Sequence, residues 1–167
     1  DTGNGDLGNQ GVHQVDLCRW ALGEQSFPTE VLSIGGRLGY DDDANTPNTQ
    51  ILWANYPTAP MLFEVRGLPQ NAAAQKENWG GSMDHYNGVR IGVVVDCERG
   101  SLRIPNYSSA EALDNEGNSI QKWHGANNHF ADFVNAVRSG LASDLSADIQ
   151  EGHLSAAPCH FASLSHH

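Results

Sequence analysis

The apolar positions near the start of the chain recur at the spacing of a helix. Between Asn9 and Leu22, the residues Val12, Val15, Cys18 and Leu22 form one apolar stripe at helical period. Gly23 follows as a C-terminal cap, and Pro28 disfavours any continuation of the helix. The pattern therefore predicts a helix over residues 9–22.

Several later segments have the composition and alternation of β-strands, and turn residues separate them. We expect strands over Thr29 to Leu38, Thr49 to Tyr56, Met61 to Arg66, Val89 to Cys97, Ser101 to Ile104 and Ser119 to Trp123. The connector 57–60 contains two prolines and predicts an antiparallel hairpin, and the turn 98–100 predicts a second one.

The segment Met61 to Arg66 predicts a strand with one apolar face and one mixed face. Side chains alternate across a strand, so Met61, Phe63 and Val65 point one way. The intervening positions, which include Glu64 and Arg66, point the other way. Residues 69–88 are polar and predict a long surface loop.

The chain closes with two predicted helices. The first carries an apolar face at spacing i, i+3, i+4, i+7 and ends at Gly140; the face consists of Phe130, Phe133, Val134 and Val137. Before the second, Asp148 and Glu151 resemble a capping box, and Pro158 should kink or shorten that helix. A helix, then a block of strands, then helices predicts an α+β fold rather than alternating βαβ units.

Composition limits the class of protein. The 167 residues are enough for one domain, and 39% are hydrophobic against 17% charged, which permits a packed core. The formal net charge of −11 argues against nucleic acid or an anionic membrane surface as a partner. No apolar run is long enough to span a bilayer.

The cysteines and the first residues bear on the compartment. Cys18, Cys97 and Cys159 are far apart and include no CxxC pair, which fits a reducing compartment where buried cysteines act as small hydrophobes. The first ten residues have no signal-peptide pattern. We therefore expect a cytoplasmic location, with export left open because a signal can lie upstream of Asp1.

A glycine pattern, G-x-G-x-x-G, occupies residues 3–8. It binds a dinucleotide only when a strand precedes the glycines and a helix follows, so that the pyrophosphate meets the helix N-terminus. Only two residues precede Gly3. The plainer interpretation is a flexible loop entering the first helix.

Histidines are the candidates for chemistry. His13 follows Asn9 by four residues, so both share a helix face, and imidazole suits proton transfer near neutral pH. The alternative is a surface or capping histidine. A metal site at His124, His129, His153 or His160 lacks a completing carboxylate or thiol cluster, and the acidic run 41–43 fits a solvated turn.

The stretch GNQGVHQVDLCRWALG (residues 8–23) resembles the start of the C-terminal domain of Gfo/Idh/MocA oxidoreductases. That family carries Asp-x-x-x-His, then x-x-Asp, and later a Trp and a Gly. Here His13, Asp16, Trp20 and Gly23 occupy the corresponding positions. Further similar segments lie at 35–50, 63–69, 128–140 and 144–165. The chain is most similar to a bacterial subgroup of predicted dehydrogenases.

The resemblance implies an architecture. Members have an N-terminal Rossmann domain that binds NAD or NADP and carries a catalytic lysine in a Glu-Lys-Pro motif. Their C-terminal domain is an open, mainly antiparallel sheet with helices on one face, like that of glyceraldehyde-3-phosphate dehydrogenase. The other sheet face forms much of the oligomer interface. This chain contains neither Glu-Lys-Pro nor a Rossmann unit, so residues 1–167 are expected to be one C-terminal domain of a longer, two-domain oxidoreductase, inactive alone and without bound cofactor.

The resemblance also implies roles for residues. His13 would be the general base on a hydroxyl of a sugar, polyol or related compound, Asn9 would orient it, and Gln10 and Gln14 would line the substrate pocket. Many members have Asp where this chain has Asn9, and an amide holds imidazole more weakly than a carboxylate. Two alternatives follow: a non-catalytic binding or scaffolding module, or a nicotinamide-dependent hydrolase or lyase relative. Association into homo-oligomers through the sheet face is expected in either case.

Overall fold

The first helix forms where the apolar stripe predicts it. The computed structural model describes residues 3–39, 41–77, 83–125 and 127–166. A π-helical turn, η1 (Leu7–Gly11), leads directly into α1 (Val12–Leu22), so the helical region starts before Asn9. Gly23 ends α1 in the left-handed conformation with φ of 70°, as its predicted role as a cap requires.

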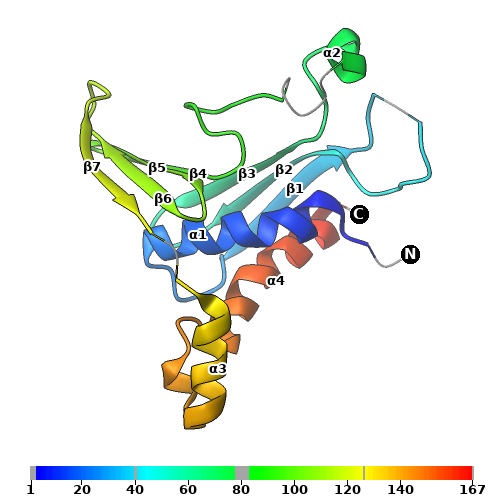
Figure 1. Ribbon diagram of the computed structural model, residues 1–167. Coiled ribbons are helices and arrows are strands. Elements are labelled where there is room, and N and C mark those ends of the chain that lie inside the picture. Colours follow the sequence, from blue (N-terminus) through cyan, green and yellow to red (C-terminus); the bar gives the residue numbers. More distant parts are fainter. Residues whose placement is uncertain (1–2, 40, 78–82, 126, 167) are drawn as a thin grey trace.

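The strands of the described chain pair only in antiparallel fashion and form two sheets (Figure 1). One sheet has the order β1-β2-β3 and the other β4-β5-β6-β7. The strands are β1 (Glu30–Gly36), β2 (Thr49–Asn55), β3 (Pro60–Arg66), β4 (Val93–Cys97), β5 (Gly100–Asn106), β6 (Ser109–Leu113) and β7 (Ser119–His124). Both predicted hairpins, β2–β3 and β4–β5, are confirmed, and so is the α+β class.

Three details of this region differ from the sequence prediction. The strand expected from Val89 starts only at Val93, because Val89 pairs instead with Tyr86 in an isolated bridge. Strand β6 was not predicted from its sequence, SAEAL. The loop expected over 69–88 contains a short helix, α2 (Ala72–Glu77), while its residues 78–82 lie outside the described chain.

The two closing helices are α3 (His129–Ser139) and α4 (Ile149–His166), with the 3-10 turn η3 (Ala142–Asp144) between them. Asp148 caps α4, because its Oδ1 accepts from the backbone N–H groups of Gln150 and Glu151. Helix α4 continues through the buried Pro158 to its end, so this proline does not shorten the helix, and a kink there stays a prediction.

Helices α1 and α4 lie side by side against one face of the β1–β3 sheet (Figure 1). The core between these layers is apolar and consists of Leu7, Val15, Leu52, Ala54, Tyr56, Met61, Val65, Cys159 and Ala162. The predicted apolar face of β3 therefore points to the helices, as Met61 and Val65 show, and Phe63 packs against the same core. The burial of these apolar side chains fixes α1, the helix that carries His13, against the sheet.

Helix α3 projects from the rest of the molecule together with η3 (Figure 1). Its predicted apolar face is present but exposed, with Phe130 at 73% and Val137 at 65% exposure. No helix in the described part of the chain is long and apolar enough to cross a membrane.

Candidate functional site

His13 stands in the first turn of α1 with an exposed side chain. Leu7 and Val15 are buried in the core on either side of it, so the helix is anchored while His13 faces outward. The preceding π-helical turn contains Asn9 and Gln10. Such turns are rare and occur frequently at functional sites.

The structure brings Gln10 and Gln14 together, and it adds Tyr107 to them. The Nε2 of Gln10 donates to the Oε1 of Gln14 at 3.2 Å and also to the hydroxyl of Tyr107. The Nε2 of Gln14 lies 3.5 Å from the same hydroxyl. Tyr107 belongs to the turn between β5 and β6, so the second sheet contributes to a site on the first helix.

Tyr107 also contacts His13 directly. The two ring centroids are 5.5 Å apart with an interplanar angle of 61°, an edge-to-face arrangement. Sequence reasoning did not single out Tyr107. No local signal could have identified it, because its contact with α1 depends on how the β5–β6 turn is placed against the helix.

Asn9 is exposed, like His13, but the described structure contains no hydrogen bond between their side chains. The predicted pairing of an amide with the imidazole is therefore not formed in this conformation. The role of Asn9 stays a prediction.

The glycine pattern of residues 3–8 serves close packing. Gly5 has φ of 62°, and a Cβ there would lie 3.0 Å from the Cβ of Thr46. A Cβ on Gly8 would overlap the side chain of Asn4. The loop is thus packed against the β1–β2 connection. The residues of this loop do not fit the strand–turn–helix cradle that a dinucleotide needs.

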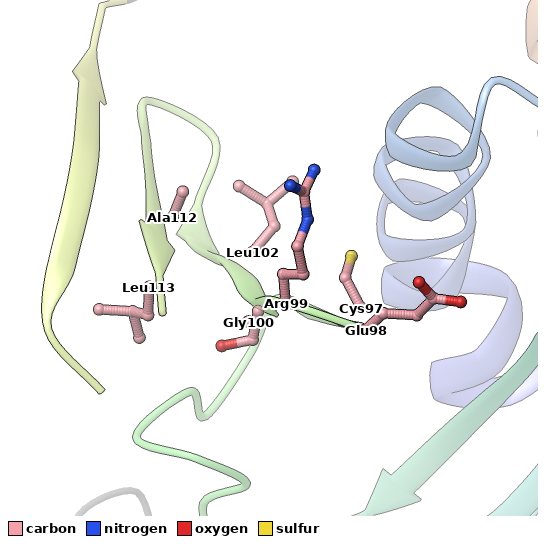
Figure 2. Close-up of a pocket in the computed structure, with 8 residues that line it drawn as sticks. Cys97, Glu98, Arg99, Gly100, Leu102, Ala112 and Leu113 are labelled. Atoms are coloured by element: carbon pink, nitrogen blue, oxygen red, sulfur yellow. The ribbon is translucent and has the colours of Figure 1, made fainter. Parts of the chain in front are cut away.

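A hollow of about 400 Å³ lies on the second sheet at the β4–β5 turn (Figure 2). It is lined by Cys97, Glu98, Arg99, Gly100, Ser101, Leu102, Ala112 and Leu113. None of the site residues on α1 takes part in it. It also brings no histidine to Cys97, which argues against a cysteine nucleophile there.

Three further histidines have separate neighbours. His129 lies against Phe130, His153 against Phe27, and the Nδ1 of His160 is 3.4 Å from the Nδ2 of Asn4. Across the described residues, no group of three or more metal-ligating side chains is found.

The cysteines are all unpaired in the structure. Burial raises the pKa of the Cys159 thiol to about 11, and burial together with the charge of Glu24 raises the pKa of the Cys18 thiol to about 11. Both are therefore protonated near neutral pH and act as small hydrophobes, as expected. Cys97 is exposed and departs from that expectation.

These features define the structural class of the chain. It is an α+β domain with helices on one face of an antiparallel sheet, and a histidine is exposed at the start of its first helix. No family model and no curated protein matches the chain. Solved structures of oxidoreductases do match it. A provisionally assigned oxidoreductase from Klebsiella pneumoniae has a TM-score of 0.62 and 13% identity, over 94% of this chain and 46% of its own.

Two further matches were solved as complexes. An oxidoreductase from Agrobacterium radiobacter, in complex with NAD+, L-tartaric acid and magnesium, has a TM-score of 0.58 and 12% identity, over 93% of this chain and 45% of its own. The WlbA dehydrogenase from Bordetella pertussis, in complex with NADH and UDP-GlcNAcA, has a TM-score of 0.51 and 12% identity, over 95% of this chain and 42% of its own. The chain thus spans about half the length of these proteins and shares their fold.

Proposed function

We propose that this chain is the substrate-binding and oligomerisation domain of an NAD- or NADP-dependent oxidoreductase that acts on a sugar, polyol or related hydroxy compound. The observation that carries the proposal is the fold, which matches oxidoreductases over more than nine-tenths of the chain. The complexes of two of them with a nicotinamide cofactor, and with tartaric acid or a sugar nucleotide, support the cofactor and the substrate class.

The nicotinamide cofactor supplies the acceptor for hydride in such a reaction. The glycine loop of this chain does not fit that cofactor, so we assign cofactor binding to a separate Rossmann domain of the whole protein. The part left to this chain is to bind the substrate and to move the proton of its hydroxyl group.

His13 is the residue suited to the proton. Its imidazole is exposed at the start of α1, where a bound substrate can reach it, and a neutral imidazole accepts a proton near physiological pH. Gln10 lies beside it and would bind another hydroxyl of the substrate, whereas Gln14 is only 5% exposed and holds Gln10 in place through a hydrogen bond. Asn9, one turn earlier, would orient the imidazole or hold a hydroxyl of the substrate.

A specific observation favours the second candidate, a non-catalytic binding or scaffolding module of the same fold. Asn9 replaces the aspartate of the resembled family, and no hydrogen bond joins it to His13 in the described structure. A histidine without a polar partner to orient it is a weaker base than one held by a carboxylate. A measurement of turnover by the protein distinguishes the two candidate functions, because only the oxidoreductase turns substrate over.

The test is the His13→Ala variant of the protein that includes the cofactor domain, assayed by nicotinamide absorbance with polyols and sugars. We expect turnover to fall by about 10²–10⁴-fold, the usual contribution of general acid–base catalysis. His153→Ala is the matched control. His153 is also exposed on a helix, but that helix is α4 and its imidazole contacts Phe27 rather than the candidate site. Unchanged turnover in His13→Ala removes His13 from the mechanism, and no turnover in the unmodified protein favours the non-catalytic module.

A further inference from the structure

Tyr107 occupies its position for a reason other than burial. The side chain is 61% exposed, so the hydrophobic effect contributes little to holding it over the start of α1. Its described contacts there are with residues of the candidate site: the amides of Gln10 and Gln14 and the imidazole of His13. An exposed aromatic side chain held by polar groups of a site points to a role in that site.

The two glutamines anchor the hydroxyl end of Tyr107 from the protein side. Gln14 is only 5% exposed, and its amide is further fixed by the bond from Gln10. The phenol oxygen accepts a hydrogen bond from the amide of Gln10, and the Nε2 of Gln14 lies 3.5 Å from the same oxygen. The ring of Tyr107 is therefore held in place rather than free to rotate away from α1.

The ring in turn restricts His13. An exposed histidine at a helix start can adopt several rotamers, and an aromatic ring in edge-to-face contact favours one orientation of the imidazole. We propose that Tyr107 is a positioning residue for His13, and that Gln10 and Gln14 hold Tyr107 so that it can act in this way. The inference rests on the proposed function of His13 as the general base.

The first part of the test needs no activity. Proton NMR of this chain follows the imidazole C–H signals of His13, assigned with His13→Ala. Tyr107→Leu removes the ring and should move the His13 signals, because the ring-current contribution is lost, while the His153 signals stay in place. Tyr107→Phe keeps the ring but loses the anchor from Gln10 and Gln14, so a smaller movement is expected. Tyr86→Leu is the matched control, since Tyr86 is an exposed tyrosine outside the site and should affect neither histidine.

The second part measures turnover in the protein with its cofactor domain. Tyr107→Leu should lower kcat by about 10–100-fold, as misplacement of a catalytic group does, with a much smaller change in KM. Tyr107→Phe should retain more activity than Tyr107→Leu. Signals of His13 that do not move in Tyr107→Leu overturn the inference.

The two proposals fail in different ways. If His13→Ala loses turnover while Tyr107→Leu keeps it, the inference about Tyr107 is wrong and the proposed function stands. If His13→Ala keeps its turnover, the proposed function is wrong and the inference falls with it.

Discussion

Arg19 joins the helix that carries His13 to the last helix of the chain. Its guanidinium is almost completely buried, and it donates to the hydroxyl of Ser155 at 2.6 Å and to the carbonyl of Glu24 at 3.0 Å. It also pairs with the carboxylate of Glu151 at 3.2 Å. Ser155 in turn donates to Asp16 on α1 at 2.6 Å. Glu151 thus pairs with Arg19, besides donating its backbone N–H to the Asp148 cap.

Replacing Arg19 by Met should destabilise the fold. The variant keeps an apolar stem but leaves the buried hydroxyl of Ser155 and the carbonyl of Glu24 without this donor, and removal of one member of a buried network is costly. We expect the free energy of unfolding to fall by about 2–4 kcal/mol, measured by urea denaturation followed by circular dichroism. Arg99→Met, at the exposed β4–β5 turn, is the control and should stay within about 0.5 kcal/mol of the unmodified chain. Equal midpoints for both variants would contradict this role of Arg19.

At the scale of elements, two glycines occupy contrasting positions: one ends a helix and the other lies inside a helix. Gly23 caps α1 with φ of 70°, and a Cβ there would meet no atom within 4 Å, so any cost of Ala at this position comes from the backbone conformation alone. Gly152 lies inside α4 with equally open surroundings and no positive φ.

Gly23→Ala should therefore destabilise the chain by about 1–2 kcal/mol, the cost of the left-handed conformation for a residue with a Cβ. Gly152→Ala should stabilise it by about 0.5–1 kcal/mol, because alanine favours a helix interior over glycine. Thermal unfolding of both variants beside the unmodified chain measures the difference. The same sign of effect for the two substitutions would refute the assignment.

Elements defined by local periodicity could be predicted from the sequence, and those defined by distant contacts could not. The helix ending at Gly23 and the β2–β3 hairpin follow from patterns within a few residues of each other. Strand β6 lacks β-branched residues and exists because β5 and β7 pair with both of its edges. The site divides in the same way: His13 follows from its helix and its motif, whereas Tyr107 depends on the placement of a remote turn.

At the scale of the whole molecule, the face of the β1–β3 sheet that points away from the helices is open and mixed, with an apolar patch beside the charged pair Glu64 and Arg66. Exposed side chains from the three strands gather there: Leu32, Ile34, Ile51 and Leu62. The register places Ile34 opposite Ile51 and aligns Leu32, Trp53 and Leu62 in one row across the sheet. An exposed apolar patch rimmed by charged side chains is typical of an interface between protein chains.

We expect this open sheet face to associate with the same face of a second copy, as proposed above for the oligomerisation role. Light scattering after size exclusion should show a dimer or larger species, and association should strengthen with salt, because the net charge of −11 makes the copies repel each other. Ile34→Glu places a charge in the middle of the face, at a side chain that is 72% exposed in the single chain, and should yield monomers without loss of folding. Ile120→Glu is the control, because Ile120 is similarly exposed but lies on β7 of the other sheet. This face is ruled out as the interface if the unmodified chain is a monomer at high concentration, or if both substitutions dissociate it equally. Loss of association only in Ile34→Glu would assign the face to contacts between copies. The His13 side of the molecule would then be free for substrate.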